Sequence, residues 1–152
     1  MKNIVVIGAG FAGLWSAIAA VRKLDELSIT LDQVRVTLIN RDAWHGIRVR
    51  NYESDLSQIR VPLDRVLAPT GVQLIEGEVT AIDPKARSIV VQTPNGQQDI
   101  IYDRLVLAAG SRVFLPDIPG LAEHGLNIDT YNETKKLDLH LKGLSYQAQS
   151  DG

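Results

Sequence analysis

Three glycines near the N-terminus have the spacing that phosphate binding requires. Gly8, Gly10 and Gly13 belong to residues 8–13 (GAGFAG), which follow a β-branched apolar run and precede an alanine-rich stretch. In a strand–turn–helix, the first glycine permits a tight turn, the second lets the main chain approach a pyrophosphate, and the third lets the helix pack against the strand. The N–H groups and the positive dipole end of the helix then face the phosphates. The sequence therefore predicts a dinucleotide site here.

The same stretch also has the hydrophobicity of a membrane-spanning or signal segment. Residues 4–21 are almost continuously apolar behind Lys2, a length close to that of a transmembrane helix. Three glycines disfavour one continuous helix, since each costs roughly 1 kcal/mol relative to alanine. A second strand pattern also follows at the distance expected for a dinucleotide fold. We therefore expect no integral membrane segment.

The end of that second strand is where an acceptor for ribose hydroxyls is expected. The strand pattern covers residues 34–39 (VRVTLI) and ends at Asn40. Asn40 offers one carbonyl acceptor and no charge, so Asn40→Glu is expected to tighten the binding of the dinucleotide. Asp42 is the alternative acceptor if the strand ends later. In a third interpretation, Asn40 only terminates the strand.

The elements that position these residues form an α/β pattern with a Rossmann-like parallel sheet. Residues 3–7, the helical pattern after Gly10 and residues 34–39 form a βαβ unit, whose crossover is right-handed. Strand patterns at 72–75 and 104–109 extend the parallel sheet, and a short helix is expected over 62–68. Residues 41–61 are expected to be an irregular loop.

A small antiparallel β-meander, over about residues 78–102, interrupts this pattern. Its strands are expected at 78–82, 88–92 and 99–102, separated by the turn signals Asp83-Pro84 and Pro94-Asn95-Gly96. After Pro119 the chain is expected to loop to Thr130, which caps a helix that Gly143 ends. Residues 1–144 would then form the domain, and 145–152 a flexible tail.

Composition narrows the possible functions. The chain has 152 residues, 45% of them hydrophobic, and a formal net charge of -2, so we expect one globular domain and no nucleic-acid partner. It has no cysteine, which excludes disulfides, zinc–thiolate sites and a redox-active cysteine pair. We expect no metal site and a cytoplasmic location.

Several sequence landmarks occur in a recognisable order. They are IVVIGAGFAG, VTLINRDAWH, GEVTAID, the hairpin, YDRLVLAAGS and LPDIPG. Together they resemble the N-terminal FAD-binding part of the pyridine-nucleotide-dependent flavoprotein oxidoreductases, closest to the type II NADH dehydrogenase branch. The resemblance covers about residues 2–141 and implies an FAD/NAD(P)-binding domain fold.

The resemblance also implies which residues bind the cofactor. Those expected to contact FAD are Gly8, Ala9, Gly10, Phe11, Ala12 and Gly13 at the pyrophosphate, Asn40 and Arg41 at the adenosine ribose, Val79 through its main chain at the adenine, and Ala108, Ala109, Gly110 and Ser111 in a second FAD-contacting turn. Ala109 departs from the threonine that is usual in the family. We assign no catalytic residue, and His45 receives no role.

The implied activity is that of an NAD(P)H:acceptor oxidoreductase, in which hydride passes to the flavin and then to a quinone or similar acceptor. The family continues with an NAD(P)H-binding domain that has its own glycine motif, whereas this sequence stops at Gly152. We therefore expect a truncated, inactive FAD-binding portion. Peripheral membrane association is allowed for a full-length relative. The open edge of the strand at 104–109 predicts self-association.

Two alternatives remain for the function. The chain is a non-catalytic dinucleotide-binding module, or it is a single-domain NAD(P)-binding Rossmann protein. The meander and the LPDIPG landmark disfavour the second alternative.

Overall fold

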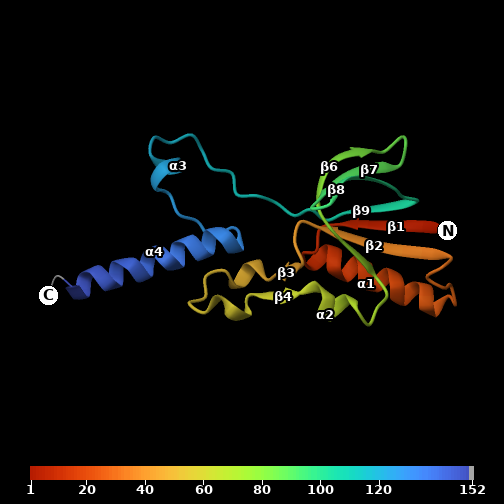
Figure 1. The fold of residues 1–152 in the computed structure, drawn as a ribbon, viewed down its shortest axis with the longest axis horizontal. Helices are drawn as coiled ribbons and strands as arrows, with labels where there is room; N and C mark the ends of the chain where they lie inside the picture. The colour runs from red at the N-terminus through yellow and green to blue at the C-terminus, as the bar shows by residue number, and fades with distance from the viewer. Residues whose placement is uncertain (151–152) are drawn as a thin grey trace. The chain divides into compact units, whose positions relative to one another are not determined.

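The computed structural model describes the backbone of residues 1–150 and the side chains of residues 1–144 (Figure 1). The chain divides into two compact units. Unit 1 comprises residues 1–45 and 61–110, and unit 2 comprises residues 46–60 and those from 111 onward. No helix among the described residues combines the length and the apolar character needed to cross a bilayer.

Unit 1 is built on a four-stranded parallel sheet. The elements of unit 1 are β1 (Lys2–Ile7), α1 (Phe11–Glu26), β2 (Val34–Asn40), α2 (Leu63–Leu67), β5 (Gln73–Glu76), β6 (Glu78–Asp83), β7 (Ser88–Thr93), β8 (Gly96–Ile101) and β9 (Arg104–Leu107). The strand order is β5-β2-β1-β9, and every pairing in it is parallel. This confirms the predicted α/β fold class and the βαβ unit.

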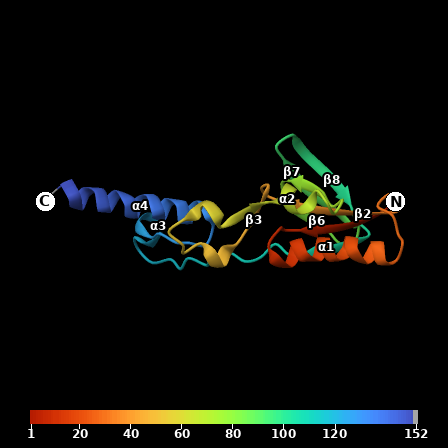
Figure 2. The same cartoon turned by 90° about the horizontal axis from the view of Figure 1, so that it is seen from below.

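The alternation of side chains along β1 and β2 gives the sheet two apolar faces. Val6 and Leu38 pack with buried residues of α1 and α2, such as Leu14 and Leu63. The side chains of Val5 and Ile39 point to the opposite face and pack with residues of the meander. Figures 1 and 2 show α1 along one face of the sheet and β6–β8 over the other. Burial on both faces explains why residues 4–7 of β1 form a continuous apolar run.

The meander is a separate antiparallel sheet in the order β6-β7-β8, as predicted. Gly96, with φ of 113°, is the first residue of β8 and directly follows the two-residue turn that ends β7; glycine adopts such a positive φ without steric cost. The register of β6 against β7 shifts between Val79 and Ala81, which leaves Thr80 as the extra residue of a β-bulge.

Two short strands, β3 (Trp44–Gly46) and β4 (Arg60–Pro62), form a two-stranded sheet. The elements of unit 2 are the 3-10 helices η1 (Arg48–Arg50) and η2 (Leu56–Gln58) and the helices α3 (Leu121–His124) and α4 (Tyr131–Ser150). In unit 2, Asp129 accepts hydrogen bonds from the Arg48 side chain and from the Val113 N–H. Asn51 Nδ2 donates to the carbonyl of Ile128 at 2.9 Å.

Several sequence expectations need correction. Residues 41–61 contain β3, η1, η2 and most of β4, so they are not irregular. Helix α3 was not predicted, and α4 continues past Gly143 to Ser150. Strand β9 ends at Leu107 rather than at residue 109.

Further expectations concern the N-terminal cap of α4, the two outer strands of the sheet and the C-terminal end of the chain. Thr130 caps α4 as expected, since its Oγ1 accepts from the Glu133 N–H at 3.3 Å. Strand β5 is only partly buried because it is an outer strand. β9 is the other outer strand, and self-association through it stays a prediction. The flexible tail at 145–152 also stays a prediction, with 145–150 inside α4 and 151–152 outside the described residues.

Candidate dinucleotide-binding site

The predicted residues of the first glycine turn, the ribose position and the second turn follow three parallel strands at one edge of the sheet. Ile7 is in register with Ile39 on one side and with Leu107 on the other. The next residue of each strand therefore lies at the same carboxyl edge. The Gly8 N–H donates to the carbonyl of Ile39 at 2.8 Å, and the Ala108 N–H donates to the carbonyl of Ile7 at 2.9 Å. Crevices outside the carboxyl ends of parallel strands are where α/β sheets bind ligands.

The three glycines of the motif differ in what surrounds them. Gly8 has φ of 95°, and a Cβ on it would lie 2.4 Å from the Ala108 carbonyl oxygen. A Cβ on Gly13 would lie 1.8 Å from the Gly8 carbonyl oxygen. A Cβ on Gly10 would meet no described atom within 4 Å. Gly10 has φ of -67° and ψ of -177°, a conformation open to any residue. The fold thus requires glycine at 8 and 13, but not at 10.

The start of α1 exposes N–H groups that the protein leaves without a cap. Gly10 is the N-cap residue, and no side chain among the described residues caps it. The first turn has no acidic residue, and Gly10, Phe11 and Ala12 are exposed. The first helical bond runs from the Leu14 N–H to the Gly10 carbonyl at 2.9 Å. The N–H groups before Leu14 therefore suit an anion.

Asn40 ends β2, is half-buried, and uses its side chain to bind the first glycine turn and the residues that follow β2. Its Oδ1 accepts from the Ala9 N–H at 2.9 Å. Its Nδ2 lies 2.9 Å from the Asp42 carbonyl, 3.1 Å from Asp42 Oδ1 and 3.3 Å from the Trp44 carbonyl. Only the second lone pair of Oδ1 is left for a ribose hydroxyl. The ribose contact of Asn40 stays a prediction.

His45 is the site residue that sequence reasoning missed. The residue lies in β3 and is 6% exposed, and its Nδ1 lies 2.7 Å from the Ala9 carbonyl oxygen. It also meets the Phe11 ring edge to face, with 4.8 Å between ring centroids and 88° between planes. The nearest signal in the sequence is the aromatic pair Trp44-His45 soon after β2, which does not indicate a contact 36 residues away.

The remaining predicted residues lie on several elements. Arg41 follows β2 and is exposed, and Val79 is half-buried in β6 next to the bulge. The Gly77 N–H donates to the Asn40 carbonyl at 2.8 Å, which holds the start of β6 near the end of β2. Ala109 and Gly110 are exposed after β9. Ser111 belongs to unit 2, where Arg48 Nη1 donates to its carbonyl and its Oγ, each at 3.2 Å.

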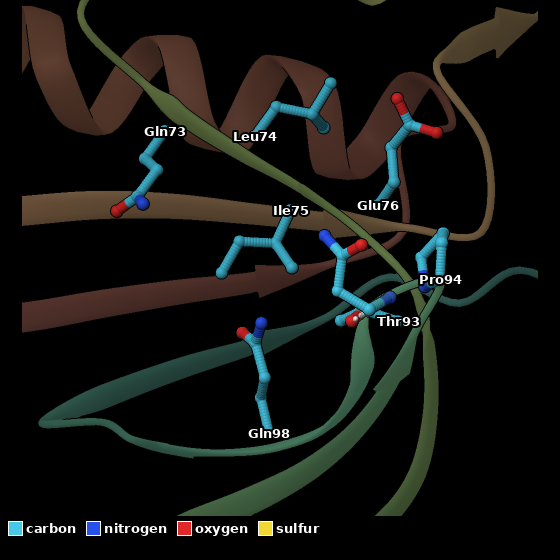
Figure 3. Close-up of a pocket in the computed structure, with 8 residues that line it drawn as sticks. Gln73, Leu74, Ile75, Glu76, Thr93, Pro94 and Gln98 are labelled. Atoms are coloured by element: carbon cyan, nitrogen blue, oxygen red, sulfur yellow. Dashed lines mark hydrogen bonds between the residues drawn. The ribbon is translucent and has the colours of Figure 1, made fainter.

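A surface cavity of about 500 Å³ lies elsewhere in unit 1. Figure 3 shows that its labelled side chains come from β5 and from the β7–β8 hairpin. Its polar lining consists of Gln73, Glu76, Thr93, Asn95 and Gln98. It includes no residue of the glycine turn. Among the described residues, no group of three or more histidine, aspartate or glutamate side chains could hold a metal ion.

Comparisons with known proteins agree on one family. Residues 2–148 match the pyridine nucleotide-disulphide oxidoreductase family. An NADH dehydrogenase-like protein of Mycobacterium tuberculosis is 50% identical over 145 residues, which are 95% of this chain and 36% of that protein. A type II NADH:quinone oxidoreductase of Staphylococcus haemolyticus is 30% identical over 146 residues, 93% of this chain and 34% of that enzyme. The chain spans about a third of the length of these relatives.

A solved structure supports the same fold. The sulfide:quinone oxidoreductase of Aquifex aeolicus superposes with a TM-score of 0.76 at 24% identity, over 96% of this chain and 33% of that one. At this level of identity the likeness concerns the fold alone.

Proposed function

Since this chain belongs to the pyridine nucleotide-disulphide oxidoreductase family, we propose that it binds FAD at the carboxyl edge of the four-stranded sheet. It would serve as the FAD-binding portion of an NAD(P)H:acceptor oxidoreductase of the NADH dehydrogenase type. The relatives named NADH dehydrogenase-like and type II NADH:quinone oxidoreductase support this choice.

The observation that carries the proposal is the open space at Gly10. Neither its backbone conformation nor its packing requires glycine, because a Cβ there would meet no described atom. A pyrophosphate lying against this position does require it, because any side chain would occupy the place of the phosphates. The uncapped start of α1 supplies N–H donors beside that space.

The other residues have distinct proposed roles. The N–H groups of Phe11, Ala12 and Gly13 would hold the pyrophosphate, and Arg41 or the free lone pair of Asn40 would meet the adenosine ribose. The main chain at Val79 would contact the adenine. Ala108, Ala109, Gly110 and Ser111 would provide the second FAD-contacting turn.

The chemistry in this proposal belongs to the cofactor. Bound FAD would accept a hydride from NAD(P)H and pass the electrons to a quinone or similar acceptor. The residues of this chain bind and orient, and none is proposed as a general acid or base. The sequence has one dinucleotide fingerprint, so we propose that the 152-residue chain alone oxidises NADH no faster than free flavin does.

The test is titration of the purified chain with FAD, followed by the quenching of tryptophan fluorescence. Gly10→Val should abolish binding and leave the free energy of unfolding nearly unchanged. Gly143→Val is the matched control, because a Cβ at Gly143 also meets no described atom within 4 Å; it should bind FAD like the wild type. Equal binding by Gly10→Val would refute the pyrophosphate assignment. A wild-type chain that binds NAD(H) but not FAD would favour the single-domain NAD(P)-binding alternative.

The activity claim needs a separate assay. NADH consumption at about 340 nm, with excess FAD and a quinone, is compared with a protein-free control, since hydride transfer requires the two rings at roughly 3–3.5 Å. We expect equal rates. Turnover by the wild type that disappears in Gly10→Val would show that this chain builds a complete active site.

A further inference from the structure

We propose that Asn40 and His45 are positioning residues that hold the peptide groups of Ala9 from both sides and so aim the Gly10 N–H at a phosphate. The Ala9 clamp is defined as Asn40 Oδ1, His45 Nδ1 and the N–H and C=O of Ala9. The inference rests on the proposed function, because the Gly10 N–H would join the N–H groups of Phe11, Ala12 and Gly13 that are assigned to the FAD pyrophosphate.

The Ala9 clamp and the end of β2 together hold three polar groups of the turn. Residues 39–45 engage the Gly8 N–H through the Ile39 carbonyl, the Ala9 N–H through Asn40 Oδ1, and the Ala9 carbonyl through His45 Nδ1. A carbonyl oxygen only accepts hydrogen bonds. His45 Nδ1 therefore carries a hydrogen and donates it to Ala9.

The orientation of each clamping side chain is itself determined. The Asn40 amide places Nδ2 against three acceptors, two on Asp42 and one on Trp44. Its Oδ1 must then face the Ala9 N–H. The His45 ring is buried and lies edge to face against Phe11, which limits its rotation. A donor and an acceptor that are each held in place, one buried and one half-buried, resist rotation of the turn.

Peptide geometry passes this restraint on to Gly10. The Ala9 carbonyl and the Gly10 N–H belong to one planar peptide group, and the described chain has no cis peptide bond. In a trans peptide the N–H points opposite to the C=O. Because His45 holds the Ala9 carbonyl, it turns the Gly10 N–H away from His45 and the interior.

Pre-orientation matters because Ala9 stands between two glycines. Glycine has more backbone freedom to lose than other residues. Ordering an unclamped turn when the ligand binds would therefore cost conformational entropy and lower the affinity. A turn fixed before the ligand arrives avoids that cost. The clamp also means that Asn40 can support the cofactor through the turn, independently of any direct contact with ribose.

The first experiment uses the ligand-free chain and nitrogen-15 NMR. The clamp predicts the Nδ1–H tautomer of His45 and an Ala9 N–H that is protected from hydrogen exchange. Asn40→Leu should accelerate that exchange at least tenfold, whereas Asn132→Leu, at an exposed position on α4, should not. An Nε2–H tautomer or an unprotected Ala9 N–H would overturn the clamp, whatever the chain binds.

The second experiment separates positioning from general stability by comparing ADP, which has a pyrophosphate, with adenosine, which has none. His45→Phe removes the donor but keeps an aromatic ring against Phe11. The variant should bind ADP about tenfold more weakly, which corresponds to ~1.4 kcal/mol of binding free energy. Its affinity for adenosine should be unchanged. The ADP-induced shift of the Gly10 amide resonance should shrink along with the ADP affinity. His45→Asn, whose Nδ2 can donate near the position of Nδ1, should restore most of the affinity.

His140→Phe, at an exposed position on α4, is the matched control and should bind ADP normally. If His45→Phe lowers the affinities for ADP and adenosine equally, or if His45→Asn does not restore ADP binding, His45 has a merely structural role. A wild-type chain that binds neither FAD nor ADP would refute the proposed function and the aim at a phosphate together. The NMR result would still decide whether the Ala9 peptides are clamped.

Discussion

The first glycine turn, residues 8–13, and the start of the second turn, residues 108–110, follow neighbouring strands of one sheet but are held differently. Two side chains from residues 40–45 bind the first turn. The second begins with one main-chain bond, from the Ala108 N–H to the Ile7 carbonyl, and then exposes Ala109 and Gly110. The turns touch at Gly8, whose missing Cβ leaves room for the Ala108 carbonyl. The spacing of glycines in the sequence does not reveal these differences. They become visible in the hydrogen bonds of each turn and in the space around each glycine Cα.

The largest effect is expected where a glycine is required by packing. Gly13→Ala would place a Cβ 1.8 Å from the Gly8 carbonyl oxygen, forcing α1 away from the first turn. We expect a loss of about 3 kcal/mol or more in the free energy of unfolding, measured by urea denaturation. Gly10→Ala, with open space around it, should change the value by less than about 0.5 kcal/mol. A smaller loss of stability for Gly13→Ala than for Gly10→Ala would contradict the conclusion that packing requires glycine at position 13 but not at position 10.

The next effect concerns the clamped side of the first turn. The sequence alone predicts that Asn40→Glu tightens FAD by adding a charge for the ribose. The structure favours the opposite sign, because a carboxylate would replace the Nδ2 donor that faces Asp42 Oδ1 at 3.1 Å. We expect FAD affinity to fall about tenfold, equivalent to ~1.4 kcal/mol. Tighter FAD binding by Asn40→Glu in a fluorescence titration would instead support a direct contact between residue 40 and the ribose.

A smaller effect is expected in the second turn. Gly110 has φ of 73°, but a Cβ there would meet no described atom within 4 Å. Gly110→Ala should therefore cost only the left-handed backbone strain, about 1 kcal/mol. Gly110→Asn, a residue that tolerates this conformation better, should cost less. Equal losses in the two variants, measured by thermal unfolding, would mean that backbone strain is not the cause.

The smallest effect lies at the opposite end of the β1–β9 pair that carries both turns. The Asp103 carboxylate accepts from the Asn3 N–H at 2.8 Å and from Lys2 Nζ at 3.0 Å. These bonds, the Asn3 N–H first, hold the pKa of Asp103 below its ordinary value of 3.8. A lowered pKa contributes stability above pH ~4, and that contribution is lost as the pH falls through the folded-state pKa.

Asp103→Asn should therefore lower the free energy of unfolding at neutral pH and flatten its decline below pH ~4. Asp117→Asn, at an exposed position, is the control. If the free energy of unfolding falls with the same slope below pH ~4 in the wild type and in Asp103→Asn, Asp103 does not contribute to the acid sensitivity.

Sequence reasoning succeeded where the signal is local. Strands β1 and β2 are apolar because both faces of the sheet are covered, and Asn95-Gly96 marks the hairpin without tertiary information. It failed for β3 and β4, which have three residues each and too little periodicity to detect. It also stopped α4 at Gly143, although one glycine costs a helix only about 1 kcal/mol. The glycine turn could be located from the sequence, but its contact with His45 depends on the folded chain.

The central position of β1 has a consequence for how the protein is made. β1 is synthesised before β2 and β9, yet it lies between these two strands in the sheet. Asp103, which precedes β9, binds the Asn3 N–H across 100 positions of sequence. Until residues 104–107 have been synthesised, one side of an apolar strand has no partner. Such an incomplete sheet is prone to mispairing, so we expect the free side of β1 to need protection until β9 has been synthesised.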